Sequence, residues 1–488
     1  MCRPRSFKLL ALTSCVLLTL FGCGGHRDKP QYSTSVSPAT SGTGSTTSGT
    51  GSTNTNTNTS TATLDVAATT SGAVADSKMV ADVVALTVTL AATGTDPVEI
   101  TEINVTAKGT IDESTALGEL KIVGDDNANG ALDQGEQTLT SVAAPAFPAD
   151  DATITVALSN PLQIAAGASV SLLVTVDATA GPQAALALIG KTIELEISAA
   201  GDVVATSNGQ AITATPTGFP ISQAPTALYV HDHLLLSEIV RMPGSGEYIE
   251  LFNPTAQPID LSDVYLTDST NLATAPTWNY HLLPTGTGFQ PVDPNNDFIV
   301  RFPAGASIAP GQAITVAMDA TGFQTLYGQL PDYFLRNGAG AAVAMLSDDG
   351  QNPPTWAAPG TGIRGGLTDG GEPVILFRWD GQTDLVQDLD YIFYGTESAS
   401  NTRVFKDPSL TVDGPDADTN PSAYLADTDT INQTPFAGAG SPNSAIARVE
   451  YTEAGETATA GNGITGHDET SEPFDVNFMN AVPTPGAP

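Results

Sequence analysis

The fold class of this chain is decided by positions 84–90, Val-Ala-Leu-Thr-Val-Thr-Leu, where apolar residues recur at every second position. Because successive side chains of a β-strand point to opposite faces, this period of two predicts a strand with one buried face. The same alternation recurs at Ile103 and Val105, Leu120 and Ile122, Ile154 to Leu158, Val170 to Val176, and Ile193 to Ile197. Helical spacing is nearly absent from this region.

Turn-rich pieces such as Thr93-Gly94-Thr95-Asp96-Pro97 separate these rows, which is typical of an antiparallel sandwich of the immunoglobulin type over residues 64–217. A linker with Pro220 and Pro225 is predicted over 218–232, and a second β-rich region over 233–488. Its predicted strands are 234–240, 248–252, 314–318, 342–346, 374–377 and 391–394, separated by long loops at 270–297, 348–371 and 396–445. We therefore predict an all-β protein with two immunoglobulin-like β-sandwich modules.

Residues 1–22 are typical of a lipoprotein signal peptide. Three basic residues precede an apolar stretch from Leu9 to Phe21, which is too short to span a bilayer. The stretch ends in Leu20-Phe21-Gly22-Cys23, which resembles the bacterial lipobox and implies lipid attachment at Cys23. Two alternatives are the similar sequence ending at Cys15 and a buried N-terminal helix.

Residues 23–63 are rich in Ser, Thr, Gly and Asn, a composition that predicts a disordered tether. The only other cysteines are Cys2 and Cys15, so no disulfide is expected after cleavage. By resemblance to lipoprotein sorting rules, Gly24 after Cys23 favours the outer membrane or cell surface over the inner membrane. We expect an envelope protein held on a membrane through its N-terminal lipid.

The chain carries 53 acidic and 17 basic residues, for a formal net charge of −36. A phosphate-binding surface needs Lys or Arg to replace counterions, so nucleic acid is a poor partner. Cations, above all calcium, are plausible partners of such a chain. The alternative is that the acidity serves only to keep an extracellular protein soluble.

The sharpest chemical motif is the stretch 125–136, which matches the D-x-[DN]-x-[DN]-G-x5-E calcium loop at every required position. Calcium prefers six to eight oxygen ligands, and Gly130 permits the sharp turn that wraps the chain around an ion. The predicted strand before the loop distinguishes it from an EF-hand, and a structural calcium ion is expected. The alternative is an Asx-rich turn that needs no metal. The candidate ligands are Asp125, Asn127, Asn129, Ala131 through its carbonyl, Asp133 and Glu136.

The C-terminal half resembles the lamin tail domain. The resemblance is carried by Ser237-Glu238-Ile239, by Glu247-Tyr248-Ile249-Glu250-Leu251-Phe252-Asn253-Pro254 and by Asp260-Leu261, with further pieces at 302–312, 388–395, 444–448 and 483–488. It covers about residues 233–488, although long insertions make this copy larger than a usual lamin tail. The resemblance implies an immunoglobulin-like β-sandwich that serves as an accessory, binding or attachment module without activity of its own.

Other acidic and histidine-containing stretches carry weaker signals. Strand carboxylates of the C-terminal region, Glu238, Glu247 and Glu250, are expected on the solvent face and are not expected to be catalytic. The acidic loop 413–429 is open to two interpretations, a second cation site or a solvated loop. His231 and His233 have metal-like spacing on one strand face, but no further ligand is marked nearby, so we interpret them as a linker edge.

These features predict a non-enzymatic, lipid-anchored envelope protein whose β-sandwich modules bind an unknown protein or glycan partner. No G-x-S-x-G or H-E-x-x-H motif occurs in the sequence, and histidines are scarce. Two alternatives remain open: an extracellular hydrolase that uses acidic residues of the long loops, and a purely structural surface spacer.

Overall fold

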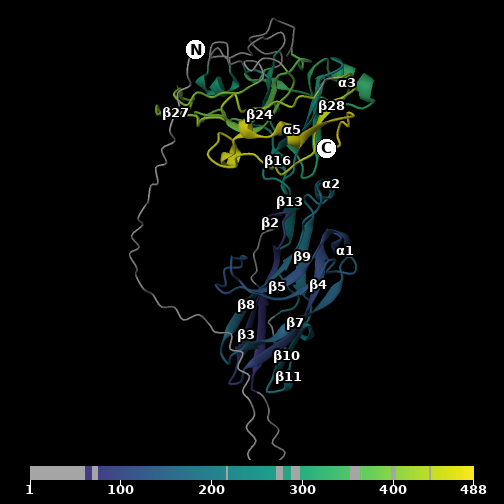
Figure 1. Ribbon diagram of the computed structural model, residues 1–488, viewed down its shortest axis with the longest axis vertical. Helices are drawn as coiled ribbons and strands as arrows, with labels where there is room; N and C mark the ends of the chain where they lie inside the picture. Colours follow the sequence, from purple (N-terminus) through teal and green to yellow (C-terminus); the bar gives the residue numbers. More distant parts are fainter. Residues whose placement is uncertain are drawn as a thin grey trace, which may run out of the picture. The chain divides into compact units, whose positions relative to one another are not determined.

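A computed structural model describes residues 61–68, 75–215, 218–270, 279–286, 297–351, 363, 365–396, 403–438 and 441–488. The signal peptide, Cys23 and nearly all of the tether predicted over 23–63 lie outside these ranges. Within them the chain is an all-β protein, as the alternating sequence predicts, and its helices are short (Figure 1). No helix in the described part of the chain combines the length and apolar character needed to span a bilayer.

The N-terminal region is built from two β-sheets around one apolar core, which runs from Ala62 to Leu228. The first sheet has the order β1 (Thr63–Ala68), β3 (Val83–Thr93), β8 (Ser169–Val176), β5 (Leu120–Gly124), β6 (Thr138–Val142). The second has the order β11 (Gln210–Ile212), β10 (Val203–Ser207), β4 (Val98–Gly109), β9 (Thr192–Ile197), β13 (Thr226–Tyr229), β2 (Ala75–Lys78), with β7 (Thr153–Ile164) on β4 and β12 (Ile221–Ser222) on β9. Its helices are α1 (Glu113–Ala116), α2 (Pro182–Leu186) and the 3₁₀ turn η1 (Ala200–Asp202).

The alternation that opens the sequence argument explains this core. Leu86, Val88 and Leu90 of β3 are buried and lie opposite Val174, Leu172 and Val170 of β8. A register shift between Val84 and Leu86 breaks the strict period, so that Val84 is only partly buried. A β-bulge of this kind turns the chain locally and lets more than one face of a strand contribute to the core.

The C-terminal region has a second core, which runs from Leu234 to Phe478 and contains residues of both of its large sheets. One sheet has the order β22 (Val343–Ala344), β21 (Tyr333–Arg336), β20 (Ala313–Asp319), β15 (Tyr248–Phe252), β14 (Leu235–Val240), β28 (Ala445–Arg448), β29 (Phe478–Ala481). The other has the order β23 (Leu346–Ser347), β18 (Ile299–Arg301), β17 (Val264–Thr267), β24 (Pro373–Arg378), β25 (Gln387–Phe393).

Short elements complete this region. Two small ribbons pair β16 (Ile259–Asp260) with β19 (Ser307–Ile308) and β26 (Thr411–Val412) with β27 (Ser422–Ala423). The helical segments are α3 (Ala320–Tyr327), α5 (Phe474–Asn477) and the 3₁₀ turns η3 (Tyr280–Thr285), η4 (Ile464–Gly466) and η5 (Glu469–Ser471).

Two sequence-based expectations need correction. The linker predicted over 218–232 contains β12 and β13, because Ile221 and Leu228 have a core to enter and β9 offers an edge to pair with. The strand carboxylates expected in solvent are buried, with Glu238 at 2 %, Glu247 at 7 % and Glu250 at 0 % exposed. The cause is tertiary: Thr484 N and Gly486 N of the C-terminal segment donate to Glu238 and Glu250, and Leu367 N donates to Glu247.

Candidate functional site

The predicted calcium loop lies between β5 and β6, which are an antiparallel pair. Asp125 is buried, and its two carboxylate oxygens accept hydrogen bonds from Asn129 N and Gly130 N, each at 3.1 Å. Its Oδ2 also accepts from Ser171 Oγ of β8 at 3.0 Å. At the far end, the Glu136 carboxylate accepts from Asp126 N at 3.2 Å and from Asp133 N at 2.9 Å. The carboxylates at the two ends of the motif therefore close the loop.

Hydrogen bonds from side chains also hold the middle of the loop. The side-chain amides of Asn127 and Asn129 donate to Asp133 Oδ2 at 2.7 and 2.9 Å, and Ala131 N donates to Asn129 Oδ1. Gly130 has φ of 75°, the left-handed turn for which glycine is suited. The structure thus gathers the six predicted ligand residues in one compact turn that its own hydrogen bonds also hold. Calcium binding stays a prediction.

The acidic loop 413–429 divides into two parts with different surroundings. Asp427 is buried, and its Oδ1 lies 3.1 Å from the ammonium of the fully buried Lys406 and accepts from Asn462 Nδ2 at 2.8 Å. Lys406 Nζ also lies 2.7 Å from Asp388. Burial opposes the charge of this lysine, but Asp388 and Asp427 outweigh that effect and raise its pKa. Asp427 therefore shares the charge of one buried lysine with Asp388.

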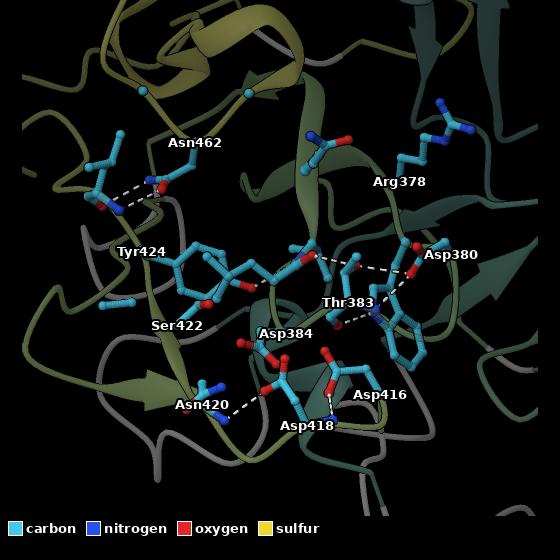
Figure 2. A pocket seen from close by; sticks show the side chains of 18 residues that line it. Arg378, Asp380, Thr383, Asp384, Asp416, Asp418, Asn420, Ser422, Tyr424 and Asn462 are labelled. Atoms are coloured by element: carbon cyan, nitrogen blue, oxygen red, sulfur yellow. Dashed lines mark hydrogen bonds between the residues drawn. The ribbon is translucent and has the colours of Figure 1, made fainter. Parts of the chain in front are cut away.

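Asp416 and Asp418, in the other part, line an open pocket of about 890 Å³ (Figure 2). Three segments form its walls: the end of β24 with the following loop to β25, residues 416–425, and residues 461–463. Figure 2 shows the carboxylates of Asp384, Asp416 and Asp418 gathered on one side. The other polar and aromatic lining side chains include Arg378, Trp379, Asp380, Asn420, Tyr424 and Asn462.

Hydrogen bonds hold these walls in place. Asn462 clamps residue 425, because its Oδ1 accepts from Leu425 N at 2.7 Å and its Nδ2 donates to Leu425 O at 2.9 Å. Trp379 Nε1 donates to Thr383 O at 2.8 Å, which fixes the half-buried indole in the wall. Hydrogen bonds lower the pKa of Asp380, mainly that from Thr383 N, and those from Ser422 and Gly414 lower the pKa of Asp384. Both side chains are thus held as carboxylates.

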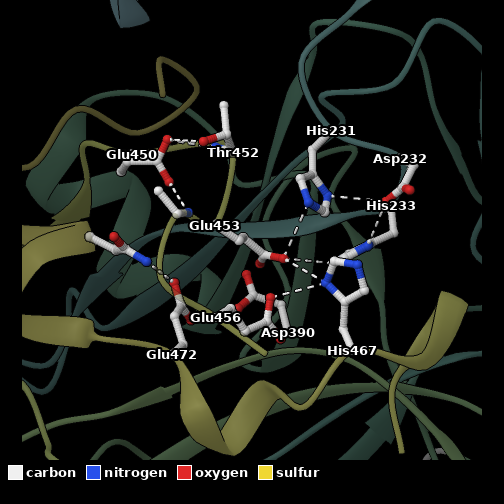
Figure 3. Close-up of polar contacts among 12 residues, drawn as sticks. His231, Asp232, His233, Asp390, Glu450, Thr452, Glu453, Glu456, His467 and Glu472 are labelled. Atoms are coloured by element: carbon white, nitrogen blue, oxygen red, sulfur yellow. Dashed lines mark hydrogen bonds and ion pairs between the residues drawn. The ribbon is translucent and has the colours of Figure 1, made fainter. Parts of the chain in front are cut away.

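A second cluster, which we name the histidine–glutamate centre, consists of His231, His233, Glu453 and His467 (Figure 3). The two histidines predicted to form a linker edge are buried, at 1 % and 2 % exposed, and Glu453 is 4 % exposed. Glu453 Oε2 lies 3.4 Å from His231 Nε2, 3.4 Å from His233 Nε2 and 3.7 Å from His467 Nδ1. The three imidazole rings are mutually perpendicular, with interplanar angles of 86–89°.

Local structure explains how distant segments meet in this centre. Residues 231–233 belong to the short connection between β13 and β14, which bends at Asp232 and His233. An isolated bridge between Thr457 and Asp468 closes the loop between them, and this places Glu456 beside His467, with 3.0 Å between Oε2 and Nδ1. Glu453 has φ of 53°, a left-handed conformation that costs a non-glycine residue about 1 kcal/mol.

Burial and neighbouring charges both shift the pKa values of the ionisable groups in the centre. Burial lowers the pKa of His231 to about 3. Burial acts the same way on His233, but Asp232 and Glu453 outweigh it and raise its pKa to about 9. Glu456 responds to burial and to the charge of Glu453, which raise its pKa to about 10. Burial also acts to raise the pKa of Glu453, yet His233 and His467 hold it well below its usual value.

More buried carboxylates surround the centre. Arg448 of β28 donates through Nη2 to both oxygens of Asp390, at 2.8 and 2.7 Å, and through Nη1 to Glu472 at 2.8 Å. Its Nε donates to Leu236 O of β14 at 2.8 Å. Arg448 therefore joins Asp390 of β25 to β14 beside the centre. Glu469 is 1 % exposed and lies in the same group as Asp390 and Glu453.

Sequence reasoning found the spacing of His231 and His233 but missed the centre. Its other residues, Glu453 and His467, lie more than 200 residues further along the chain, in a loop without recognisable motif. The only available signal was scarcity, since three of the five histidines of the chain converge here.

Comparisons with known proteins add little to these observations. No protein-family model matches the chain, and no curated protein matches it. Among solved structures, a DUF4876 family protein from Bacteroides thetaiotaomicron is similar at 14 % sequence identity, over 77 % of this chain and 94 % of that chain, with a TM-score of 0.28. This similarity is too low to carry an argument about function.

Proposed function

We propose that this chain is a non-enzymatic cell-envelope protein, anchored by lipid on Cys23, whose lamin-tail-like C-terminal module binds an extracellular or envelope glycan. The pocket at residues 378–387, 416–425 and 461–463 carries the proposal. Its carboxylates and amides match the hydroxyl groups of a sugar, and the Trp379 indole offers a flat apolar wall. Pockets that combine an aromatic surface with a few fixed polar groups are the usual form of a small-ligand site.

The charge of the pocket narrows the ligand class. Four aspartates, Asp380, Asp384, Asp416 and Asp418, line it together with a single arginine, Arg378. An acidic polysaccharide would be repelled, whereas a neutral or amino-bearing glycan would not. The proposed ligand is therefore a neutral or cationic glycan.

Two of the four pocket carboxylates, Asp380 and Asp384, are poorly suited to the acid step of hydrolysis. A glycosidase needs one carboxyl group whose pKa is raised so that it can donate a proton to the leaving group. Hydrogen bonds act in the opposite direction on Asp380 and Asp384, whose pKa values are lowered. Carboxylates held in the ionised form are suited to accept hydrogen bonds from hydroxyl groups.

A glycan array probed with the purified protein tests the proposal, with Asp416→Asn and Asp418→Asn as pocket variants. Each variant should lose about 10- to 100-fold in affinity for the bound glycan, as expected for one charge-assisted hydrogen bond. Asp429→Asn, in the same acidic loop but outside the pocket lining, is the matched control and should bind normally.

The same samples are incubated with generic glycosidase and esterase substrates. Turnover that disappears in Asp416→Asn or Asp418→Asn would replace the binding proposal by the hydrolase alternative. Wild-type protein that binds no glycan on the array would leave the spacer role.

A further inference from the structure

We infer that the histidine–glutamate centre is a binding site for a zinc-type transition metal ion, which ties the loop at 453–467 to the start of the C-terminal sheet. Three ligand atoms, Nε2 of His231, Nε2 of His233 and Oε2 of Glu453, already lie in one group. Nδ1 of His467 is the fourth, and it exchanges its 3.0 Å hydrogen bond with Glu456 Oε2 for the ion.

The distances between these atoms favour a shared metal ion over direct hydrogen bonds. Separations of 3.4, 3.4 and 3.7 Å are longer than the usual range for a hydrogen bond from nitrogen to oxygen, about 2.7 to 3.2 Å. Zinc binds imidazole nitrogen and carboxylate oxygen at about 2.0 to 2.2 Å in a tetrahedron, which places any two ligands about 3.3 to 3.6 Å apart. The separations from Glu453 Oε2 to the two histidines His231 and His233 match edges of such a tetrahedron, and these three residues form one group of mutually close ligand atoms.

Unsatisfied polar atoms point to the same conclusion. In the described part of the chain, neither carboxylate oxygen of Glu453 has a hydrogen-bond partner, and neither does His233 Nε2. A buried polar atom without a partner costs about 1 to 3 kcal/mol, and more when it is charged. Glu453 Oε2 and His233 Nε2 lie 3.4 Å apart, so a single cation can satisfy both, while Glu453 Oε1 faces Arg448 at 3.8 Å.

Asp232 occupies the position of an outer-shell carboxylate. Its Oδ1 lies 3.2 Å from His233 Nδ1 and 3.3 Å from His231 Nδ1, the nitrogens that face away from Glu453. Histidines that bind metal ordinarily donate their second ring nitrogen to a carboxylate or carbonyl, which fixes the tautomer and the ring orientation. Asp232 is placed to serve His233 in this way, whereas His231 Nδ1 has no hydrogen-bond partner in the described part of the chain.

The surrounding charge also favours a divalent cation. Asp390, Glu469 and Glu472 are buried beside the centre, and Glu456 lies against His467, while Arg448 is the cation that contacts this group. A bound divalent ion would add positive charge beside these carboxyl groups and favour their ionised forms.

Ligand chemistry identifies the class of metal. Three imidazole nitrogens and one carboxylate suit zinc and its transition-metal neighbours, whereas calcium and magnesium prefer all-oxygen cages. Four protein ligands leave no open position, which is typical of a structural zinc site. The side chain of His467 is 13 % exposed, so the ion can reach the centre from solvent on that side.

The test uses the full chain purified in detergent, stripped with a chelator and titrated with Zn²⁺ by calorimetry and with Co²⁺ by visible absorption. We expect one Co²⁺ per chain with the intense visible bands of tetrahedral coordination, displaced by Zn²⁺. Zinc should also raise the thermal unfolding midpoint, since an ion that binds only the folded state stabilises it.

Three variants are compared with the wild type. His467→Asn removes the most exposed ligand and should fold, and it should lose more than about 100-fold in zinc affinity and the tetrahedral bands, because even outer-shell changes cost about 10- to 100-fold. Asp232→Asn changes an outer-shell residue and should lose about 10- to 100-fold in zinc affinity. Glu136→Gln, in the calcium loop, is the matched control and should bind zinc as the wild type does.

The result is decisive in either direction. Wild-type protein that takes up no Co²⁺ or Zn²⁺ overturns the inference, and this measurement does not depend on the folding of any variant. Equal zinc affinity in the wild type and His467→Asn overturns it as well.

Discussion

The calcium-type loop at 125–136 and the histidine–glutamate centre differ in how the chain assembles them. The loop is contiguous, so its six candidate ligands are brought together by local turns and by hydrogen bonds such as that from Gly130 N to Asp125. The centre joins residues 231–233 to 453 and 467, and its geometry exists only after two sheets have formed.

Their surroundings differ in the same sense. Most of the loop is exposed, with Asp125 as its buried residue, whereas three of the four centre residues are less than 5 % exposed. An exposed turn can satisfy its carboxylates with water and backbone N–H groups, but a buried cluster cannot. A polar atom without a hydrogen-bond partner therefore indicates a missing ligand more strongly when it is buried in the core than when it lies at the surface.

Replacing one basic side chain beside each site should give the largest difference in the free energy of unfolding between the two regions. Arg448→Met leaves Asp390 and Glu472 buried without their cation and should lower the free energy of unfolding by about 3 to 5 kcal/mol. Lys121→Met, on strand β5 next to the calcium loop, removes a 2.7 Å contact with Asp82 between side chains that are 26 % and 27 % exposed. It should cost less than about 1 kcal/mol.

Urea unfolding of both variants at one pH and in one metal-free buffer measures this contrast. Equal losses would mean that burial does not distinguish the two regions.

The pH dependence of stability should separate two carboxylates that the sequence presents alike. Burial raises the pKa of Glu250 to about 7 from an ordinary 4.5, so the folded state binds the extra proton. Its contribution to stability is complete below about pH 4.5 and is lost as the pH rises through about 7, a change of about 3 kcal/mol. Glu250→Gln cannot ionise and should lack this loss, which unfolding free energies at pH 4.5 and 8 measure.

Asp260→Asn is the matched control for that experiment. The side chain of Asp260 is exposed, and hydrogen bonds from Ser262 lower its pKa below 3.8. Its stabilising contribution is lost only as the pH falls through that lowered value, so the variant should follow the wild type between pH 4.5 and 8. A wild-type profile identical to that of Glu250→Gln would contradict the buried, protonated state.

Calcium should give the smallest of these effects. With an extracellular-grade dissociation constant of about 10⁻⁴ to 10⁻³ M, 10 mM calcium should add about 1.4 to 2.7 kcal/mol to the stability of the N-terminal region. Glu136→Gln removes one charge and the bidentate carboxylate, so the gain should largely disappear. Calorimetric titration of calcium measures the affinity directly.

His467→Asn is the counterpart control and should bind calcium as the wild type does. Flat, identical traces for the wild type and Glu136→Gln would leave the loop as an Asx-rich turn that needs no metal.

Much of the fold could be predicted because the alternation of apolar and polar residues in a β-strand is a local pattern in the sequence. The rows at 103–105, 120–122, 154–158, 170–176 and 193–197 all lie in strands, and the predicted segments 248–252 and 374–377 lie within β15 and β24. The errors have a common cause. Glu238 and Glu250 alternate correctly with Ile239 and Ile249, but the face they occupy is covered by residues 484–486, which a local pattern cannot reveal.

The sequence by itself determined the all-β class, the strand positions and the contiguous calcium-type motif, because each depends on neighbours within a dozen residues. Only the tertiary structure decided which carboxylates are buried, which loops line the pocket at Trp379, and that His467 meets His231 and His233. These depend on pairings such as β14 with β28, across about 200 residues. Such contacts are set by the cooperative burial of two cores, which no local spacing encodes.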